Sequence, residues 1–332
     1  MVGKPFPRAG ALTVAQLITF LLIPGFSLLD FAAVAEPLRS ANRLAGPLYR
    51  WQVLSQYGAA VMASNGMTMA VDGALCELGP SDTLFVVAAY DPLQHMDPPL
   101  KQWLRRQDSA GATLGAIDTG AFLLAEAGLL RDYRLTLHWE ALDAFEEQYP
   151  GLKVSEELFE IDRRRITSAG GTASMDLMLE LIGRAHGREL ASRVAEQFVL
   201  GRIRPQQDRQ RTELAQRYKV HNRKLLMVIE RMQQALEAPL SLDALASDAG
   251  VTRRHLERLF STWLQEAPGA FYQRLRLDKA RQLLQQSDLS VLQISLACGF
   301  DSPSYFARCY RERFACTPRQ DRVILAGRAA AS

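Results

Sequence analysis

Two stretches near the C-terminus decide the fold of that part of the chain: LSLDALASDAGVTRRHLERLF at residues 240–260 and LSVLQISLACGFDSPSYFARCYRERF at residues 289–314. Each reads as a short helix, a turn and a second helix, and Gly250 and Gly299 stand at matching positions in the two turns. Glycine suits such a turn because it adopts the left-handed conformation without a clash at Cβ. Two helix-turn-helix units in one polypeptide predict DNA binding.

The ends of these helices are marked by capping residues. Ser241 and Ser290 stand at the N-cap positions of the two first helices, and Gln293, three residues after Ser290, completes a capping box. Thr252 caps one second helix, and Ser302, which a proline follows, caps the other. The sequence therefore predicts where each second helix begins.

The second helices have one apolar and one polar face. Apolar residues recur at helical spacing and are expected to pack inward: Leu256, Leu259, Phe260, Phe306, Tyr310 and Phe314. The outward residues are the predicted DNA contacts: Arg253, Arg254, Glu257 and Arg258 in the first unit, and Ser304, Ala307 and Arg308 in the second. Arginine suits bidentate recognition of guanine and ion pairs with phosphate. The alternative is an ordinary helical bundle with a solvated basic face, which the repeat disfavours.

A family resemblance appears in the second unit, where Gly-Phe, Ser-x-Ser-Tyr-Phe-x-Arg and Thr-Pro follow one another. This order is similar to the second half of an AraC/XylS-type DNA-binding domain, and YQRLRLDKARQLL at residues 272–284 resembles the linker helix of that family. The resemblance covers about residues 220–322 and implies two recognition helices that enter successive major grooves on one face of the DNA. Cys316 and Asp321 depart from it, because glycine and an aromatic residue are usual there.

Charge separates the two parts of the chain. Residues 1–200 hold 17 Lys+Arg and 23 Asp+Glu, a net of −6, whereas the remaining residues hold 22 and 13, a net of +9. A basic C-terminal portion attracts a polyanion, and its binding is expected to depend strongly on salt. The polar, arginine-rich residues 201–213 mark the boundary, although a basic arm that contacts phosphate is an alternative there.

The N-terminal portion alternates strands and helices. The predicted strands are residues 17–23, 51–55, 83–88 and 113–117, and the predicted helices are residues 30–44 and 98–107. This order indicates a mostly parallel sheet covered by helices, in which ligands bind beyond the carboxyl ends of the strands. The predicted fold class is thus an α/β sandwich with a mostly parallel sheet, followed by an all-α domain with two helix-turn-helix units.

One strand end is unusual. The segment TLGAIDTGAFLLAEAGLL at residues 113–130 passes from a strand through Asp118, Thr119 and Gly120 directly into an apolar helix, which is typical of a nucleophile elbow. His138 and Trp139 follow in LTLHWE. Asp118 has two compatible interpretations, an N-cap of the following helix and a carboxylate in a pocket.

A second resemblance rests on this elbow, on LLIPGFSLLDFAAVAEPL at residues 21–38, on the His-Trp pair and on TSAGGTASMDLMLELI at residues 167–182. These segments resemble the class I glutamine-amidotransferase-like (PfpI-type) superfamily, and in particular GlxA-like regulators with an AraC-type tail. Enzymes of the superfamily carry cysteine at the position of Asp118 and glutamate at that of Asp30. Because Asp118 replaces the thiol, the resemblance favours binding over catalysis.

The predicted ligand-binding residues are Asp30, Asp118, Thr119, His138 and Trp139. Two carboxylates in one pocket stay ionised only with a cation or a proton between them. Trp139 would add an aromatic face for a cationic head group, or be packed core. His138 would hydrogen-bond a ligand, or be a satisfied polar group at the sheet edge.

The sequence thus predicts a non-enzymatic, cytoplasmic, ligand-responsive transcription regulator, an activator of a catabolic operon for a small nitrogenous metabolite such as a betaine-like amine or a cationic amino acid. Its expected partners are promoter DNA, the effector, RNA polymerase and a second copy of the chain, without a cofactor, metal or membrane. The rivals are a hydrolase with Asp118 as nucleophile and His138 as base, and a first domain that serves only for dimerisation.

The predicted domains are a flexible tail (1–14), an amidotransferase-like ligand-sensing domain (15–200), a linker (201–218), a DNA-binding domain (219–325) and a tail (326–332). Four scattered cysteines without ligand spacing are expected to be reduced thiols.

Overall fold

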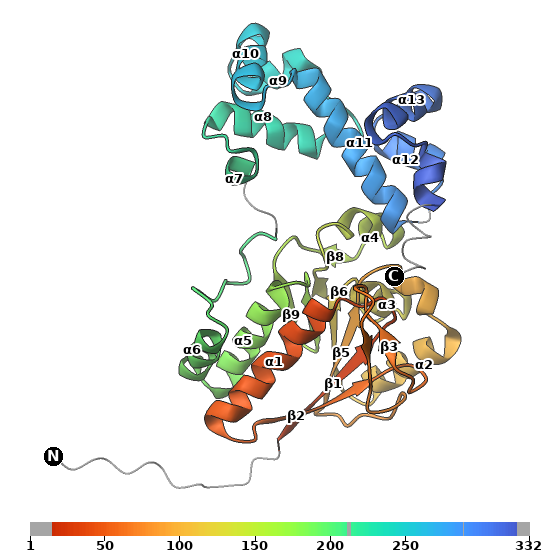
Figure 1. Ribbon diagram of the computed structural model, residues 1–332, viewed down its shortest axis with the longest axis vertical. Coiled ribbons are helices and arrows are strands. Elements are labelled where there is room, and N and C mark those ends of the chain that lie inside the picture. The colour runs from red at the N-terminus through yellow and green to blue at the C-terminus, as the bar shows by residue number, and fades with distance from the viewer. Residues whose placement is uncertain (1–14, 211–213, 288, 324–332) are drawn as a thin grey trace, which may run out of the picture. The chain divides into compact units, whose positions relative to one another are not determined.

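The computed structural model describes residues 15–210, 214–287 and 289–323 and divides into two compact units (Figure 1). The first unit contains the described residues up to His138 together with Leu152–Asp208, and the second contains Trp139–Gly151 and the residues from Arg209 onward. The predicted tails at 1–14 and 326–332 lie outside the described residues. The first unit extends to Asp208, beyond the predicted domain end at residue 200.

A six-stranded sheet forms the centre of the first unit, in the order β2-β1-β5-β6-β10-β9. All neighbours pair in parallel except β9 and β10, so the mostly parallel sheet is confirmed. The strands are β1 (Gln16–Leu22), β2 (Tyr49–Leu54), β5 (Thr83–Ala88), β6 (Thr113–Asp118), β9 (Phe159–Asp162) and β10 (Arg165–Ser168). β5 is buried along its whole length, which explains its continuous apolar sequence.

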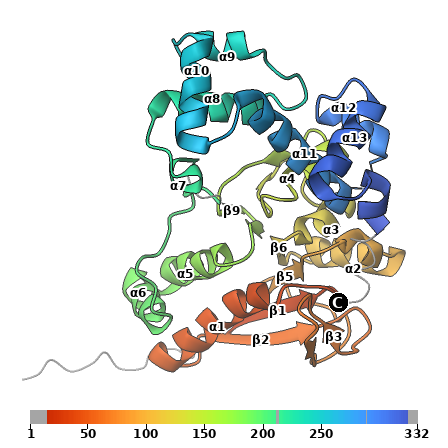
Figure 2. The ribbon, with the colours of Figure 1, turned by 45° about the horizontal axis from the view of Figure 1, so that its top comes forward.

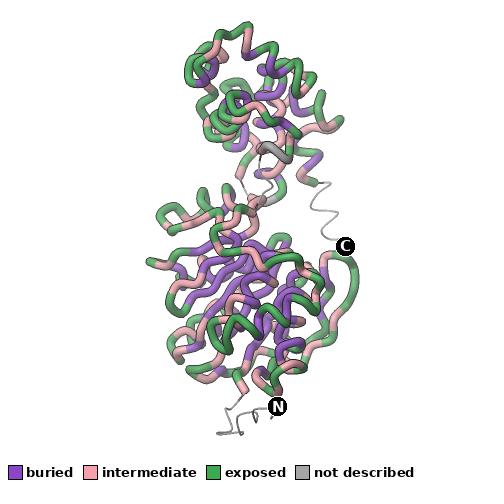
Figure 3. Tube along the Cα trace, turned by 90° about the vertical axis from the view of Figure 1, so that its left-hand side faces the viewer, coloured by how far each residue is buried: buried purple, intermediate pink, exposed green. Residues whose placement is uncertain are grey.

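Helices cover both faces of this sheet. α1 (Leu28–Ala45), α5 (Ala173–His186) and α6 (Arg188–Gln197) pack together on one face, and α2 (Pro98–Ser109) and α3 (Gly120–Glu126) lie on the other (Figure 2). Figure 3 shows that the buried residues of this unit concentrate along the strands. The smaller elements are a 3₁₀ turn (Pro92–His95) and the short strands β3 (Val61–Met62), β4 (Thr68–Met69), β7 (Arg134–Leu135) and β8 (Lys153–Val154).

The second unit is helical and has two apolar cores. Its helices are α4 (Leu142–Gln148), α7 (Leu214–Tyr218), α8 (Arg223–Gln234), α9 (Leu242–Asp248), α10 (Arg253–Leu264), α11 (Pro268–Gln286), α12 (Val291–Ala297) and α13 (Pro303–Phe314). α11 contributes Phe271 and Leu275 to the core of the first helix-turn-helix, and Leu277 and Leu283 to the core of the second. This long helix therefore joins the two helix-turn-helix units, as the resemblance implied.

The predicted caps are confirmed. The hydroxyls of Ser241, Thr252 and Ser302 each accept a backbone N–H in the first turn of the following helix, and Ser290 forms the complete capping box with Gln293. The apolar residues predicted to face inward are buried, except that Phe314 is half-buried. Helix boundaries were predictable here because short-range hydrogen bonds set them.

The contacts of Asp321 explain how an aspartate can stand where an aromatic residue is usual in the family. Its carboxylate is buried, accepts the hydroxyl of Tyr310 at 2.7 Å and pairs with Arg281 at 2.9 Å. Asp321 thus connects Tyr310 on α13 to Arg281 on α11 through a hydrogen bond and an ion pair. An aromatic residue would connect the two helices by packing. No helix among the described residues is long and apolar enough to cross a membrane.

Candidate functional site

Asp30 lies in the first turn of α1 and is almost fully buried. The hydroxyl of Ser27 caps α1 by accepting the backbone N–H of Asp30 at 3.3 Å. This contact fixes the backbone position from which the Asp30 side chain extends. The backbone N–H of Gly171 donates to Oδ1 of Asp30. The other oxygen, Oδ2, is buried and receives no N–H or hydroxyl donor from the described residues. One acceptor is therefore left over inside the protein, which is costly unless a proton or a ligand meets it.

Asp118 ends β6 with a left-handed backbone (φ 58°), and its carboxyl hydrogen-bonds that of Asp30. Aspartate tolerates this conformation better than most residues, and the turn has the abrupt strand-to-helix form of an elbow. The capping position of α3 belongs to Thr119, which corrects the interpretation of Asp118 as an N-cap. The structure brings the two predicted carboxylates together, and we call them, with Gly171, the carboxylate site.

Burial dominates the electrostatics of this site. Desolvation raises the pKa of Asp30 above its ordinary value, because a buried carboxylate loses hydration. The hydrogen bond with Asp118, the Gly171 N–H and the charge of His138 act in the opposite direction, in that order of strength. Because its pKa is raised, Asp30 holds a proton more readily than an exposed aspartate would.

Two glycines permit the close approach of the surrounding backbone. A Cβ at Gly120 would lie 2.4 Å from the carbonyl oxygen of Val86. Gly170 has φ +82°, and a Cβ there would lie 2.8 Å from Cβ of Asp118. Both contacts are shorter than a side chain allows, so the elbow and the Gly170–Gly171 turn can meet only with glycine at these positions.

The other predicted ligand-binding residues are placed differently. Thr119 is buried and donates its hydroxyl to the carbonyl of Ala89 at 2.5 Å, so it holds the elbow against the end of β5. His138 acts on Asp30 through its charge and is half-buried. Trp139 belongs to the second unit, and its part in the carboxylate site stays a prediction.

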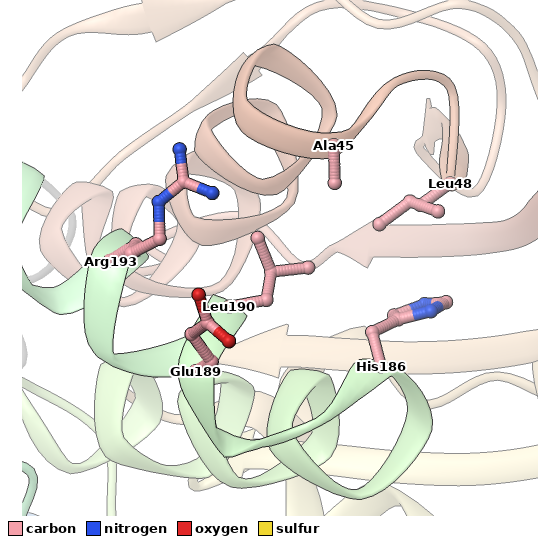
Figure 4. A pocket seen from close by; sticks show the side chains of 6 residues that line it. All are labelled: Ala45, Leu48, His186, Glu189, Leu190 and Arg193. Carbon is pink, nitrogen blue, oxygen red and sulfur yellow. The ribbon is translucent and has the colours of Figure 1, made fainter. Parts of the chain in front are cut away.

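The carboxylate site offers two carboxyl groups that can accept hydrogen bonds, which suits a positively charged ligand. The described residues contain no group of three or more His, Cys, Asp or Glu that could hold a metal ion. A surface hollow of about 400 Å³ lies elsewhere, between the end of α1 and α6, and Figure 4 shows His186, Glu189 and Arg193 around it. These three side chains are exposed, so the hollow lacks the buried, unsatisfied group that marks the carboxylate site.

The predicted DNA contacts lie at the start of α10 and α13. Arg253, Arg254, Glu257 and Arg258 are exposed on α10, and Ser304 and Arg308 are exposed on α13, while Ala307 is half-buried. The opposite faces of both helices carry the buried core residues. These side chains are thus accessible, and their contact with DNA stays a prediction.

Local contacts distinguish the arginines of these helices. Arg253 pairs with Glu257 at 3.2 Å and with Asp243 at 3.4 Å. Arg258 lies 2.9 Å from Nδ1 of His255, one turn earlier on the same helix. Arg308 stacks over the ring of Tyr305 at 5.2 Å, which orients its guanidinium group.

Sequence reasoning missed the Gly170–Gly171 turn as part of the site. Residues 167–182 carried a resemblance, but the adjacent glycines were not assigned a role. Paired glycines before an apolar helix indicate a turn whose backbone N–H groups are accessible, and this signal could have found them. The partner, Asp30, lies 141 positions earlier in the chain, so only the folded sheet brings them together.

Comparison with known proteins agrees with this division of the chain. The DJ-1/PfpI family matches residues 16–184, and a helix-turn-helix domain family matches residues 245–323. The HTH-type transcriptional regulator CdhR of Pseudomonas aeruginosa is 61% identical over 94% of this chain and 93% of its own length. The HTH-type transcriptional regulator GbdR of the same species is 43% identical over 92% of this chain and 84% of its own.

A solved structure supports the fold of the first unit. The AraC family transcriptional regulator from Pseudomonas putida has a TM-score of 0.50 and 28% identity, and the match covers 55% of this chain and all but 1% of that one.

Proposed function

We propose that this chain, which belongs to the GlxA-like AraC-type transcriptional regulators with an N-terminal DJ-1/PfpI domain, is a non-enzymatic sensor of a small cationic metabolite. In this proposal the carboxylate site binds the effector, and α10 and α13 bind promoter DNA. The regulated genes form a catabolic operon for a nitrogenous compound, of which betaine-like amines and cationic amino acids are the first candidates. The protein acts as a cytoplasmic activator, through RNA polymerase and as a dimer.

The observation that carries the effector proposal is the buried Oδ2 of Asp30, beside a second carboxyl and without a donor of its own. A cation placed there replaces the proton that Asp30 holds and supplies a positive counter-charge to the two carboxyl groups, which stabilises the liganded state. A ligand of the same shape that lacks the positive charge would supply no such counter-charge.

The experiment is isothermal titration of the full-length protein with glycine betaine, L-arginine and 3,3-dimethylbutanoate, which replaces the betaine nitrogen by carbon. Loss of a charge from a largely buried ion contact typically costs about 2 to 5 kcal/mol, a factor of roughly 30 or more in affinity. We expect one of the two positively charged compounds to bind, and the carbon isostere to bind with an affinity lower by a factor of roughly 30 or more. Asp118→Asn should remove this difference in affinity. Glu36→Gln is the matched control, because the Glu36 side chain on α1 is 44% exposed and pairs with Arg39.

Equal binding of the cation and its carbon isostere would show that the carboxylates are structural. Binding of neither cation would refute this choice of effectors.

The alternative is a hydrolase, and the retained elbow geometry of Asp118 is the observation that favours it. A carboxylate is a weaker acyl acceptor than a thiolate, and here it faces another carboxyl, so binding has the stronger support. Turnover of amide or ester substrates that disappears in Asp118→Asn, while DNA binding persists, would establish the enzyme instead.

A further inference from the structure

The residues that follow α6 are held on the first unit at several points. Leu200 and Ile203 pack against its apolar core, and the carbonyl of Gln206 accepts the N–H of Leu158 at 3.1 Å. The amide of Gln206 also donates to Glu157 at 2.8 Å and to Glu160 at 2.9 Å. We call residues 200–208 the linker strap, because they lead from the first unit toward the second.

Arg204 connects the linker strap to the start of α5. Its backbone N–H donates to Oδ1 of Asp176 at 2.9 Å, and its Nε donates to Oδ2 at 2.8 Å. Its Nη2 reaches the hydroxyl of Thr172 at 2.7 Å. The Asp176 side chain is only 4% exposed, so Arg204 is the cation that makes its burial tolerable.

The partners of Arg204 adjoin the carboxylate site. Thr172 is the N-cap of α5, but its side chain makes no capping bond and meets Arg204. The two residues before it are Gly170, which packs on Asp118, and Gly171, which donates to Asp30. The same turn thus contacts the carboxylate site through its glycines and the linker strap through Thr172.

We propose that Arg204 is a positioning residue of the carboxylate site. It links occupancy of this site to the contacts that attach the linker strap to the first unit. By fixing Thr172 and Asp176, Arg204 sets the orientation in which Gly171 presents its N–H to Asp30. Because coupling between two sites is reciprocal, a ligand that changes the Asp30–Gly171 contact changes the Arg204 contact as well. The identity of the effector rests on the proposed function, but the coupling itself exists without a ligand.

The test is hydrogen–deuterium exchange of the ligand-free, full-length protein carrying Arg204→Gln. We expect faster exchange at residues 168–174 and 28–31, by a factor within roughly 5 to 150, the range typical of coupled sites. Arg202→Gln is the matched control, because the Arg202 side chain is 69% exposed and its ion pair among the described residues is with Asp208, within the linker strap. Arg202→Gln should leave the exchange rates of residues 168–174 unchanged. Arg204→Lys, which keeps the charge but not the planar fork, should restore part of the protection.

Two further variants keep the proposal testable if Arg204→Gln unfolds the first unit. Thr172→Val removes one acceptor of Arg204 and leaves the Asp176 ion pair, and it should still raise exchange at residues 170–171. Asp30→Ala removes the acceptor of the Gly171 N–H and should raise exchange at residues 200–208. Changes confined to the neighbourhood of each substitution would overturn the proposal, because they would make Arg204 a local anchor.

Titration with glycine betaine separates this proposal from the proposed function. If glycine betaine binds, Arg204→Gln should lower the affinity for it by a factor within the same range of about 5 to 150. Arg202→Gln should leave this affinity unchanged. Where glycine betaine does not bind, the choice of effector fails, and the exchange measurements still decide the coupling.

Discussion

Asp30→Asn should make the ligand-free protein more stable at neutral pH while it removes the response to a cation. The pKa of Asp30 is raised in the folded protein, chiefly by burial. A raised pKa means that the fold favours the protonated acid, so its contribution to stability is fully present below the unfolded pKa and is lost as the pH rises through the folded pKa. Asparagine is neutral throughout and keeps an oxygen for the Gly171 N–H.

The size of the effect follows from the buried, unsatisfied Oδ2. An unsatisfied buried polar group costs about 1–3 kcal/mol, and 1 kcal/mol shifts the melting temperature of a unit of 150–250 residues by about 2–4 °C. We therefore expect Asp30→Asn to raise the melting temperature of the first unit by about 2–12 °C at pH 7, measured by calorimetry on the full chain. The difference should shrink toward zero as the pH falls below about 4, where Asp30 is protonated in both states.

Asp108→Asn is the matched control, because it makes the same chemical change in the same unit. Asp108 pairs at 2.7 Å with Arg165, whose side chain is 2% exposed, so this substitution leaves a buried cation unpaired. It should lower stability, by about 3–5 kcal/mol for a broken buried pair. An unchanged or lower melting temperature for Asp30→Asn at pH 7, or a gain that persists at pH 4, would refute the reasoning about the carboxyl pair.

Two predictions concern the second unit. Arg258→Ala should weaken binding to a site selected from random-sequence DNA by about 1–3 kcal/mol and relax the preference at one base pair, whereas Arg39→Ala, in the first unit, should leave the fluorescence-anisotropy titration unchanged. An equal loss of affinity for all DNA sequences would show that Arg258 contacts phosphate and not a base. Asp321→Asn should destabilise the second helix-turn-helix by about 1–3 kcal/mol in urea unfolding, because Tyr310 and Arg281 lose a buried partner. Asp278→Asn, which breaks the more exposed pair with Arg313, should change stability by less than about 1 kcal/mol, and equal effects would contradict the role of Asp321.

Local signals explain what the sequence could predict. Ser290 with Gln293 and the proline after Ser302 mark helix starts through hydrogen bonds and backbone limits that span three or four residues. The continuous apolar run of β5 and the abrupt turn at Asp118 likewise reveal themselves within a few positions. The two-unit fold and four of the six strands of the central sheet could therefore be predicted, whereas the meeting of Asp30 and Asp118 was expected only from the resemblance to the PfpI-type superfamily.

Contacts across long sequence separations could not be predicted in the same way. The Gly171 N–H reaches Asp30 across 141 positions, and Arg204 reaches Asp176 across 28. Neither pair has a characteristic spacing, because the register of the sheet and the path of the chain after α6 decide which residues meet. The polar composition of residues 201–213 suggested a linker, but composition does not show that Arg204 and Gln206 attach to the first unit.

The backbone of the elbow supports the argument for recognition over catalysis. A left-handed conformation at a residue other than glycine costs about 1–3 kcal/mol in general and persists where the surroundings enforce it. Asp118 keeps it at φ 58°, with Gly120 and Gly170 allowing the close contacts around it. A carboxylate gains no nucleophilic strength from this geometry, but it gains a fixed position against Asp30. The turn that would present a thiol therefore presents a carboxyl group, held against that of Asp30.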